Sequence, residues 1–316
     1  MQKIPDVNFY EEPKVKNPVM LAAWPGMGAV ATQAVDFIRN KVKATLFAEI
    51  DTRAFNVPYA VVVSEGVGSF TGIPRVLLFY SEQHDLIFCE GEEQFSGRSA
   101  LKIADRLLTL AAYLNVNKIF TGAAFVQHMN HRETPSVYSV ANNPKLRDWL
   151  THDKGVNSLK RGQISGLNGS LLGFAAQRNI DAACFLSTIP IYAVNLPNPK
   201  AAKAIIEIWG QVLDFSIDLS DFDIPIREAD NALAMVEEQL KKLAIGGITE
   251  EKEEEKMPDI NQSSEIPSSV RKKIERLFDS AKKDKTIAHR LKEELDRWDL
   301  FREYEDRFLD LFRENQ

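Results

Sequence analysis

The chain contains 316 residues, of which 44% are hydrophobic and 27% are charged, and its formal net charge is −6. This composition is typical of a globular protein with one large α/β domain and an appendage, and the acidic balance argues against nucleic-acid binding. The N-terminus lacks the apolar core of a signal peptide, and no stretch approaches the roughly 20 apolar residues of a membrane span. We therefore expect a cytoplasmic protein without a membrane partner.

Short apolar runs alternate with helical patterns from residue 19 to residue 245, which predicts an α/β fold with a mixed central sheet flanked by helices. The runs 59–66, 75–81 and 85–91 follow one another directly, so we expect them to form a meander within a crossover topology. The polar stretch that ends near residue 142 shows no element. The other predicted strands are 19–24, 44–50, 118–124 and 181–189, and the predicted helices are 29–42, 97–114, 167–179, 198–215 and 228–244.

Two features of the pattern are specific enough to predict local detail. Asn198 and Pro199 are typical of the N-cap and first position of a helix. On the helix 97–114, we expect Leu101, Ala104, Leu107, Leu108, Ala111 and Ala112 to share the buried face. The two cysteines, Cys89 and Cys184, lie in apolar runs and are expected to be buried free thiols of a reducing compartment.

The composition changes after residue 245. Residues 1–245 form the predicted α/β core domain, and the acidic segment 246–267 has little to bury, so we interpret it as a flexible linker. In residues 268–316 the apolar residues recur at steps of three or four, which predicts a C-terminal helical hairpin with a break near Lys283. Its aromatic residues Trp298, Phe301, Phe308 and Phe312 are expected to be buried.

The loop "WPGMG" at residues 24–28 joins a predicted strand to a predicted helix. Free N–H groups at such a place could hold a phosphate, but the loop has no cation, no third glycine and no Gly-Lys-Ser/Thr sequence. We therefore favour a role for Gly26 and Gly28 in the turn itself.

Three other groups of residues could carry chemistry. His128 and His131 with Glu133 have some metal-ligand character, although a polar loop is the simpler interpretation. Ser165 precedes a helix and is better interpreted as an N-cap than as a nucleophile, because the Gly-x-Ser-x-Gly elbow is absent. Glu90, Glu92 and Glu93 could form an acid–base pair, but solvated turn carboxylates are more common.

Several motifs in this order resemble the proteasome-assembly-chaperone family in its archaeal and bacterial branch. They are "WPGMGAV", "FCEGEE", "FTGAAF…HRETPSVY", "GQISGLNGSLLGFA", "STIPIYAVNLPNPKAA" and "ERLFDSAKKDK", within residues 19–316. The resemblance implies a fold similar to the nucleoside phosphorylases, a homo-oligomer, and a chaperone or scaffold role toward a proteasome-like particle or another complex, without a cofactor. Relatives that act on proteasomes often have tyrosine second from the end, whereas this chain ends in "DLFRENQ".

The alternative is a small-molecule enzyme that processes nucleosides or joins a carboxylate to an amine with ATP. In either case we expect a pocket beyond the carboxyl ends of the strands, where open α/β sheets place their sites. We predict no catalytic or metal-binding residue. The candidate pocket residues are Gly26, Met27, Gly28, Glu90, Glu92, Gly122, His131, Arg132, Ser165, Asn168, Gly169 and Asn198.

Overall fold

The structure is a computed structural model that describes residues 4–55, 61–70, 72–246 and 268–283, with residues 291, 292, 295, 300, 304, 307, 308 and 311 described singly. The chain divides into two compact units, Met1–Gly247 and Ile248–Gln316. Each unit has its own buried apolar core. None of the helices in the described part of the chain combines the length and apolar character that a bilayer crossing needs.

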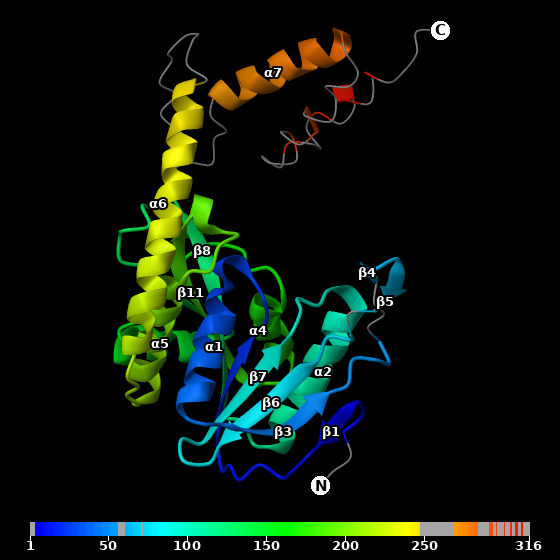
Figure 1. Cartoon of the computed structure of the whole chain (residues 1–316), viewed down its shortest axis with the longest axis vertical. Helices are drawn as coiled ribbons and strands as arrows, with labels where there is room; N and C mark the ends of the chain where they lie inside the picture. The colour runs from blue at the N-terminus through cyan, green and yellow to red at the C-terminus, as the bar shows by residue number, and fades with distance from the viewer. Residues whose placement is uncertain are drawn as a thin grey trace. The chain divides into compact units, whose positions relative to one another are not determined.

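The first unit is built on a nine-stranded sheet of order β1-β3-β6-β7-β2-β8-β11-β9-β10 (Figure 1). Strands β7, β2, β8 and β11 are parallel neighbours, while the pairs β7–β6, β6–β3, β3–β1 and β11–β9 are antiparallel, so the sheet is mixed as predicted. The strands are β1 (Val7–Phe9), β2 (Val19–Ala23), β3 (Thr45–Ile50), β6 (Val76–Ser81), β7 (Leu86–Gly91), β8 (Lys118–Gln127), β9 (Val137–Ala141), β10 (Asn157–Ser158) and β11 (Asp181–Pro190).

Helices cover both faces of the sheet. Residues of α1 (Val30–Lys41) and α5 (Pro199–Leu213) form one buried cluster with the sheet, and residues of α2 (Gly97–Tyr113) and α4 (Leu167–Gln177) form the other. Along β2, Met20 and Ala22 belong to the α2 side whereas Leu21 and Ala23 belong to the α1 side, as the two-residue period of a strand requires. The remaining helical elements of this unit include α3 (Pro144–Asp148), the π-helical turn η2 (Trp149–Asp153) and α6 (Asp223–Gly246).

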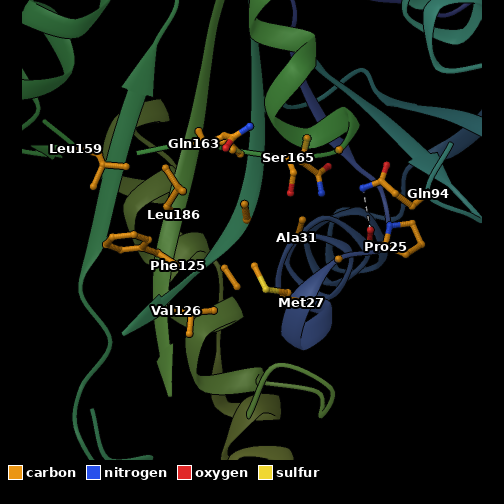
Figure 2. Close-up of a pocket in the computed structure, with 16 residues that line it drawn as sticks. Pro25, Met27, Ala31, Gln94, Phe125, Val126, Leu159, Gln163, Ser165 and Leu186 are labelled. Carbon is orange, nitrogen blue, oxygen red and sulfur yellow. Dashed lines mark hydrogen bonds between the residues drawn. The ribbon is translucent and has the colours of Figure 1, made fainter. Parts of the chain in front are cut away.

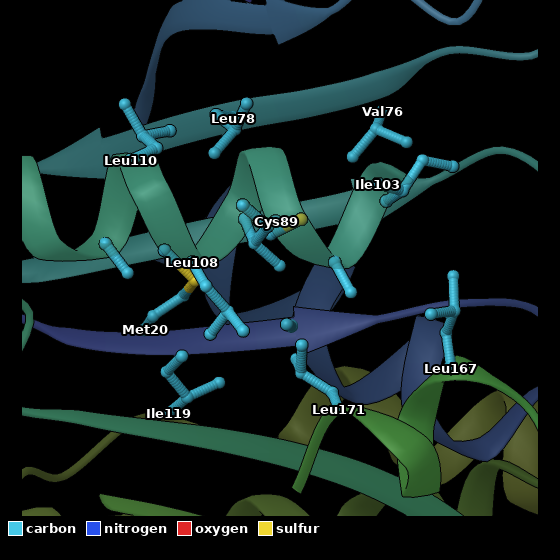
Figure 3. Packing of buried hydrophobic residues seen from close by; sticks show 14 of the residues in the cluster. Met20, Val76, Leu78, Cys89, Ile103, Leu108, Leu110, Ile119, Leu167 and Leu171 are labelled. Carbon is cyan, nitrogen blue, oxygen red and sulfur yellow. The ribbon is translucent and has the colours of Figure 1, made fainter. Parts of the chain in front are cut away.

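The cluster under α2 shows how this packing is achieved (Figure 3). Ile103, Leu108 and Leu110 of α2 lie over strand residues such as Leu78 and Cys89. The prediction that Cys89 and Cys184 are buried free thiols is confirmed. Burial raises the pKa of the Cys184 thiol to about 12 and raises the pKa of Cys89 as well. In contrast to the prediction, Leu101 and Ala112 are exposed, because they lie at the margins of the apolar stripe of α2.

Of the three strands expected to form a meander, the first does not join the central sheet, so that part of the prediction is wrong. Residues Val62–Ser64 form β4, which pairs with β5 (Val67–Ser69) in a separate two-stranded sheet, and β3 takes the place beside β6. Residues 59 and 60 lie outside the described residues. An apolar, β-branched run predicts a strand, but it does not determine which sheet the strand joins.

Strand β9 (Val137–Ala141) was not predicted, because it lies within a polar stretch. It pairs antiparallel with β11, where Tyr138 lies opposite Leu186. Of its five residues only Ser139 is fully buried. An edge-side strand of this kind lacks the continuous apolar run that marks the central parallel strands.

The second unit contains α7 (Ser268–Lys283) and a buried cluster. Phe278 stacks on Tyr304, with ring centroids 5.7 Å apart, and Phe308 is buried as expected. Trp298, Phe301 and Phe312 lie outside the described residues, as does most of the predicted linker 246–267. The cluster consists of Ile274, Phe278, Ala281, Leu291, Leu295, Leu300 and Phe308.

Candidate functional site

A cavity of about 470 Å³ lies near the carboxyl ends of the central strands (Figure 2). Its lining comes from the turn after β2, the last half of β8, β11 and the segment before α4. None of the side chains in this lining is charged. The lining residues are Pro25, Gly26, Met27, Ala31, Gln94, Ala123, Ala124, Phe125, Val126, Leu159, Gln163, Ile164, Ser165, Gly166, Asn168 and Leu186.

The cavity exists because β2 and β8 separate. Their register ends at Ala22 and Thr121, while β8 continues to pair with β11 as far as Gln127. Directly after β2, the Asn168 side chain accepts a hydrogen bond from the Trp24 N–H and donates one to the Trp24 carbonyl, both at 2.9 Å. The Thr121 hydroxyl donates to the Asn168 carbonyl at 2.5 Å. The buried Asn168 carboxamide therefore satisfies backbone groups at the point where β2 and β8 part.

A second amide joins the segment before α4 to the turn after β2. Gln94 accepts from the Leu167 N–H at 3.2 Å and donates to the Pro25 carbonyl at 3.1 Å. A Cβ on Gly166, whose φ is +75°, would lie 2.3 Å from the Gln94 amide. Gly166 is the N-cap of α4 and makes no side-chain cap, so the interpretation of Ser165 as the N-cap is wrong. Ser165 is instead an exposed residue of the cavity lining.

The glycine loop at residues 24–28 is held by backbone hydrogen bonds to the rest of the chain. Gly28 has a φ of +64°, its N–H donates to the Val194 carbonyl at 3.0 Å, and the Ala29 N–H donates to the Gly26 carbonyl at 3.0 Å. The Asn198 N–H in turn donates to the Gly28 carbonyl at 2.7 Å. The Asn198 side chain accepts from the Ala201 N–H at 3.0 Å, which confirms the predicted cap of α5. These bonds occupy the N–H groups of Gly28 and Ala29 where the helical segment begins, which favours a turn rather than a phosphate cradle.

Trp24 and Gly91 form a contact that the sequence analysis missed. The Trp24 side chain is fully buried, and a Cβ on Gly91 would lie 2.2 Å from its Cδ1 atom. Within the described part of the chain, the Trp24 indole nitrogen has no hydrogen-bond partner. The sequence signal was the glycine that ends the apolar run 85–91, because glycine within a strand often marks a close approach of another group.

The two predicted acids do not line the cavity. Glu90 lies within β7 and its carboxylate accepts from the Arg39 guanidinium at 2.6 Å. Burial raises the pKa of Glu90, and the neighbouring Arg39 opposes this shift. Glu92 is exposed and pairs with Arg75 at 2.8 Å. The interpretation of these acids as solvated turn carboxylates therefore fails for Glu90.

His131 belongs to a separate polar cluster that ties its loop to α6. The buried His131 ring lies 3.0 Å from the Tyr192 hydroxyl and 3.4 Å from a Glu237 carboxylate oxygen, both measured from Nδ1. Lys200 donates to the His131 carbonyl at 2.7 Å and to Asp230 at 2.8 Å. Among the residues that the structure describes, no group of three or more His, Cys, Asp or Glu residues is placed to hold a metal ion.

The remaining candidates have packing environments. Arg132 is exposed beside His131. A Cβ on Gly122 would lie 3.3 Å from Ala31, and one on Gly169 would lie 2.5 Å from the Ile164 carbonyl, so both glycines allow close approaches. Of the twelve predicted residues, those that line the cavity are Gly26, Met27, Ser165 and Asn168.

The cavity is suited to binding more than to acid–base chemistry. Both amide atoms of Gln94 and Asn168 are engaged in hydrogen bonds within the chain. Ser165 and Gln163, like Gln94, are exposed polar residues of the lining. An uncharged lining of this kind stabilises apolar groups and gives a charged ligand nothing to offset its lost hydration.

The chain belongs to the PAC2 family, whose model matches residues 20–244. This is the family of proteasome assembly chaperone homologues from archaea and bacteria, so the resemblance described in the sequence analysis is confirmed. The comparison with curated proteins gave no match.

Solved structures with the same fold come from several organisms. Pyrococcus furiosus PbaB, an archaeal proteasome activator, has a TM-score of 0.62 at 22% identity, over 73% of this chain and 98% of its own. P. furiosus PbaA, an archaeal homolog of proteasome-assembly chaperone, has a TM-score of 0.58 at 19% identity, over 75% of this chain and 99% of its own. The proteasome-assembly chaperone homologue of Mycobacterium tuberculosis has a TM-score of 0.56 at 21% sequence identity, over 74% of this chain and 97% of its own. At these identities the likeness shows the fold.

Proposed function

We propose that this protein is a non-enzymatic assembly chaperone or scaffold that acts in the cytoplasm, as a homo-oligomer, on a proteasome-like particle. The observation that carries the proposal is the cavity after β2, where the amides of Asn168 and Gln94 bind the chain itself. A site whose inner polar groups serve the fold, and whose lining is uncharged, is suited to contacts with another polypeptide. The similar solved structures, a proteasome activator and assembly chaperone homologues, support the same class of partner.

Self-association is supported by the hairpin of β4 and β5, which lies away from the central sheet in Figure 1. Residues 61–70 include five large hydrophobic side chains that are 50–69% exposed, and Glu65 is the one charged residue among them. Among the described residues, neither β4 nor β5 pairs with a further strand, and residues 61–70 contain none of the lysines or prolines that usually protect a strand edge. The exposed side chains are Val61, Val62, Val63, Val67 and Phe70.

The low charge of this hairpin permits a second copy of the chain as its partner. Two copies that each carry a net charge of −6 repel each other, and the nearly uncharged hairpin is a surface where this repulsion is small. A two-fold axis would place the same apolar residues of both copies against each other. We therefore propose the β4–β5 hairpin as the self-association surface.

The function is tested by mixing the purified chain with the core-particle subunits of the same organism. We expect a stable complex in sedimentation, together with faster assembly of the particle or altered peptide hydrolysis by it. Thermal-shift measurements with ATP, a nucleoside and inorganic phosphate serve as the control, and we expect no stabilisation by these ligands. A shift approaching the roughly 2.7 kcal/mol given by a ligand at 100 times its Kd would instead support the small-molecule enzyme.

A further inference from the structure

We propose that the cavity beside β8 binds an extended, uncharged segment of a partner polypeptide by adding it as a strand to the free edge of β8. This inference rests on the proposed function, because it names the chemistry of the segment that such a chaperone would hold. It comes from three features of the cavity: its position along β8, the lack of a neighbouring strand there among the described residues, and the chemistry of its walls.

The position of the cavity shows that it lies on the edge of β8. Ala123 and Phe125 pack toward the core under α2 and α4, whereas Ala124 and Val126 pack toward the core under α1 and α5. All four of these successive residues nevertheless line the cavity. Side chains that point to opposite faces of a sheet can border one cavity only where that cavity lies along the strand edge.

This edge of β8 is left open by the end of β2. Within the described chain, β8 pairs with β11 on one side to Gln127, but its register with β2 on the other side ends at Thr121. The Trp24 backbone groups, which follow β2, are bonded to Asn168 instead. Five residues of β8, 123–127, are therefore available for a further strand over roughly 17 Å.

The walls determine which segment fits. Apolar side chains dominate the walls. In Figure 2, Phe125 lies near Leu186 and Leu159, and Met27 lies on the side of Val126. Met27 is 45% exposed at the mouth, and its flexible side chain can adapt to different apolar groups. Ser165 and Gln163 offer polar contacts at the rim. An extended segment with apolar, uncharged side chains matches both the strand edge and these walls.

The probe for this site is a capped seven-residue peptide of alternating threonine and valine with a fluorescent label, added to the full chain and followed by fluorescence anisotropy. Two further peptides carry N-methyl groups on the odd or on the even residues, which removes the backbone donors of one peptide edge at a time. We expect saturable binding of the unmodified peptide. One methylated peptide should bind at least about tenfold more weakly and the other should bind at most about threefold more weakly, because a strand edge uses alternate N–H groups.

Two pairs of variants locate the binding. Met27→Glu places a charge in the cavity, while Ile191→Glu does so at another exposed apolar residue outside it. Ser165→Trp fills the rim, while Ser170→Trp adds the same group to an exposed position of α4 outside the cavity. We expect Met27→Glu and Ser165→Trp to weaken peptide binding at least about tenfold and their matched controls to change it less than about twofold.

Equal binding of both methylated peptides and the unmodified one would overturn strand addition, and so would the absence of saturable binding or an equal loss in the control variants. If the chain acts on the core particle but does not bind the peptide, this inference fails and the proposed function remains. If the peptide binds at the cavity but the core particle is unaffected, the proposed function fails alone.

Discussion

Asn168 is the residue on which the separation of β2 and β8 depends. Its side chain bonds both backbone groups of Trp24, and it is nearly inaccessible to solvent. Asn168→Ala leaves a buried N–H and a buried carbonyl without partners, at about 1–3 kcal/mol each, so we expect the free energy of unfolding to fall by about 2–6 kcal/mol in urea titrations. Asn157→Ala, at an exposed asparagine, is the control and should change it by less than about 0.5 kcal/mol. A loss of under 1 kcal/mol in Asn168→Ala would contradict this role.

Gly28 combines a positive φ with close neighbours. A Cβ there would lie 3.1 Å from Val30 Cγ2 and 3.3 Å from Asn198 Cβ. We expect Gly28→Ala to lower the free energy of unfolding by about 1–2 kcal/mol in urea titrations. Gly173→Ala is the matched control, because Gly173 is helical with open space around its Cβ position. It should stabilise the protein by about 0.5–1 kcal/mol. Equal effects of the two substitutions would contradict the argument.

Glu90 and Asp51 should give opposite pH dependences. Burial raises the pKa of Glu90 in the folded protein, so its contribution to stability is present at low pH and is lost as the pH rises through the folded pKa. The Arg53 side chain lowers the pKa of Asp51, so that contribution is present above the unfolded pKa and lost as the pH falls.

The measurement is the free energy of unfolding between pH 3 and pH 7 for the wild type, Glu90→Gln and Asp51→Asn. The wild-type stability minus that of Glu90→Gln should decrease as the pH rises. The wild-type stability minus that of Asp51→Asn should increase. Two differences with slopes of the same sign would disprove one of the two assignments.

At the level of elements, the sequence predicted the buried framework well. Strands β2, β8 and β11 are rich in apolar residues, and α5 has Asn198 and Pro199 at its start, so their local signals agree with their tertiary positions. Strand β9 and the hairpin β4–β5 depend on neighbours that no local pattern specifies. The former lies within a polar stretch yet pairs with β11, and the latter is apolar yet exposed.

The position of the cavity could also be predicted from local signals, but the side chains that line it could not all be predicted. Met27 and Ser165 were expected near strand ends, and strand ends meet at one edge of a parallel sheet. Glu90 and His131 also lie near strand ends, but their side chains pair with Arg39 and with Tyr192 away from the cavity. A sequence pattern gives the edge of the sheet at which a residue lies, whereas the direction of its side chain depends on partners far away in the chain.

The β4–β5 hairpin provides the prediction at this scale. Val63→Lys with Val67→Lys places two charges among its exposed apolar side chains, and Ile224→Lys with Met235→Lys makes the same change in charge on α6, at similarly exposed residues. We expect sedimentation velocity at micromolar concentration to show an oligomer for the wild type and the α6 control. The hairpin variant should sediment as the 35.6 kDa monomer. A hairpin variant that stays oligomeric would exclude this surface, and a monomeric wild type would also exclude the homo-oligomer.

At the level of the whole molecule, the two units have separate cores. Phe120 is buried in the sheet of the first unit, and Phe278 is buried in the second unit. Removing a buried phenylalanine costs about 3–5 kcal/mol, so each substitution to alanine should lower the unfolding temperature of its own unit. Calorimetry should show two transitions, of which Phe120→Ala shifts one and Phe278→Ala shifts the other. A single transition that moves in both variants would show that the units unfold together.

The burial of Cys89 and Cys184 has a practical consequence for labelling. A thiol must ionise and meet its reagent to react, and both thiols are enclosed and hard to deprotonate. The folded protein should therefore leave maleimides nearly unreacted at neutral pH while its natural cysteines remain in place. A single cysteine introduced at Met27 or Val63, both of which are exposed, could then carry a dye or spin label without a cysteine-free background. A label at Met27 would then report on ligand binding at the cavity, and a label at Val63 would report on contacts of the hairpin, with the rest of the chain unchanged.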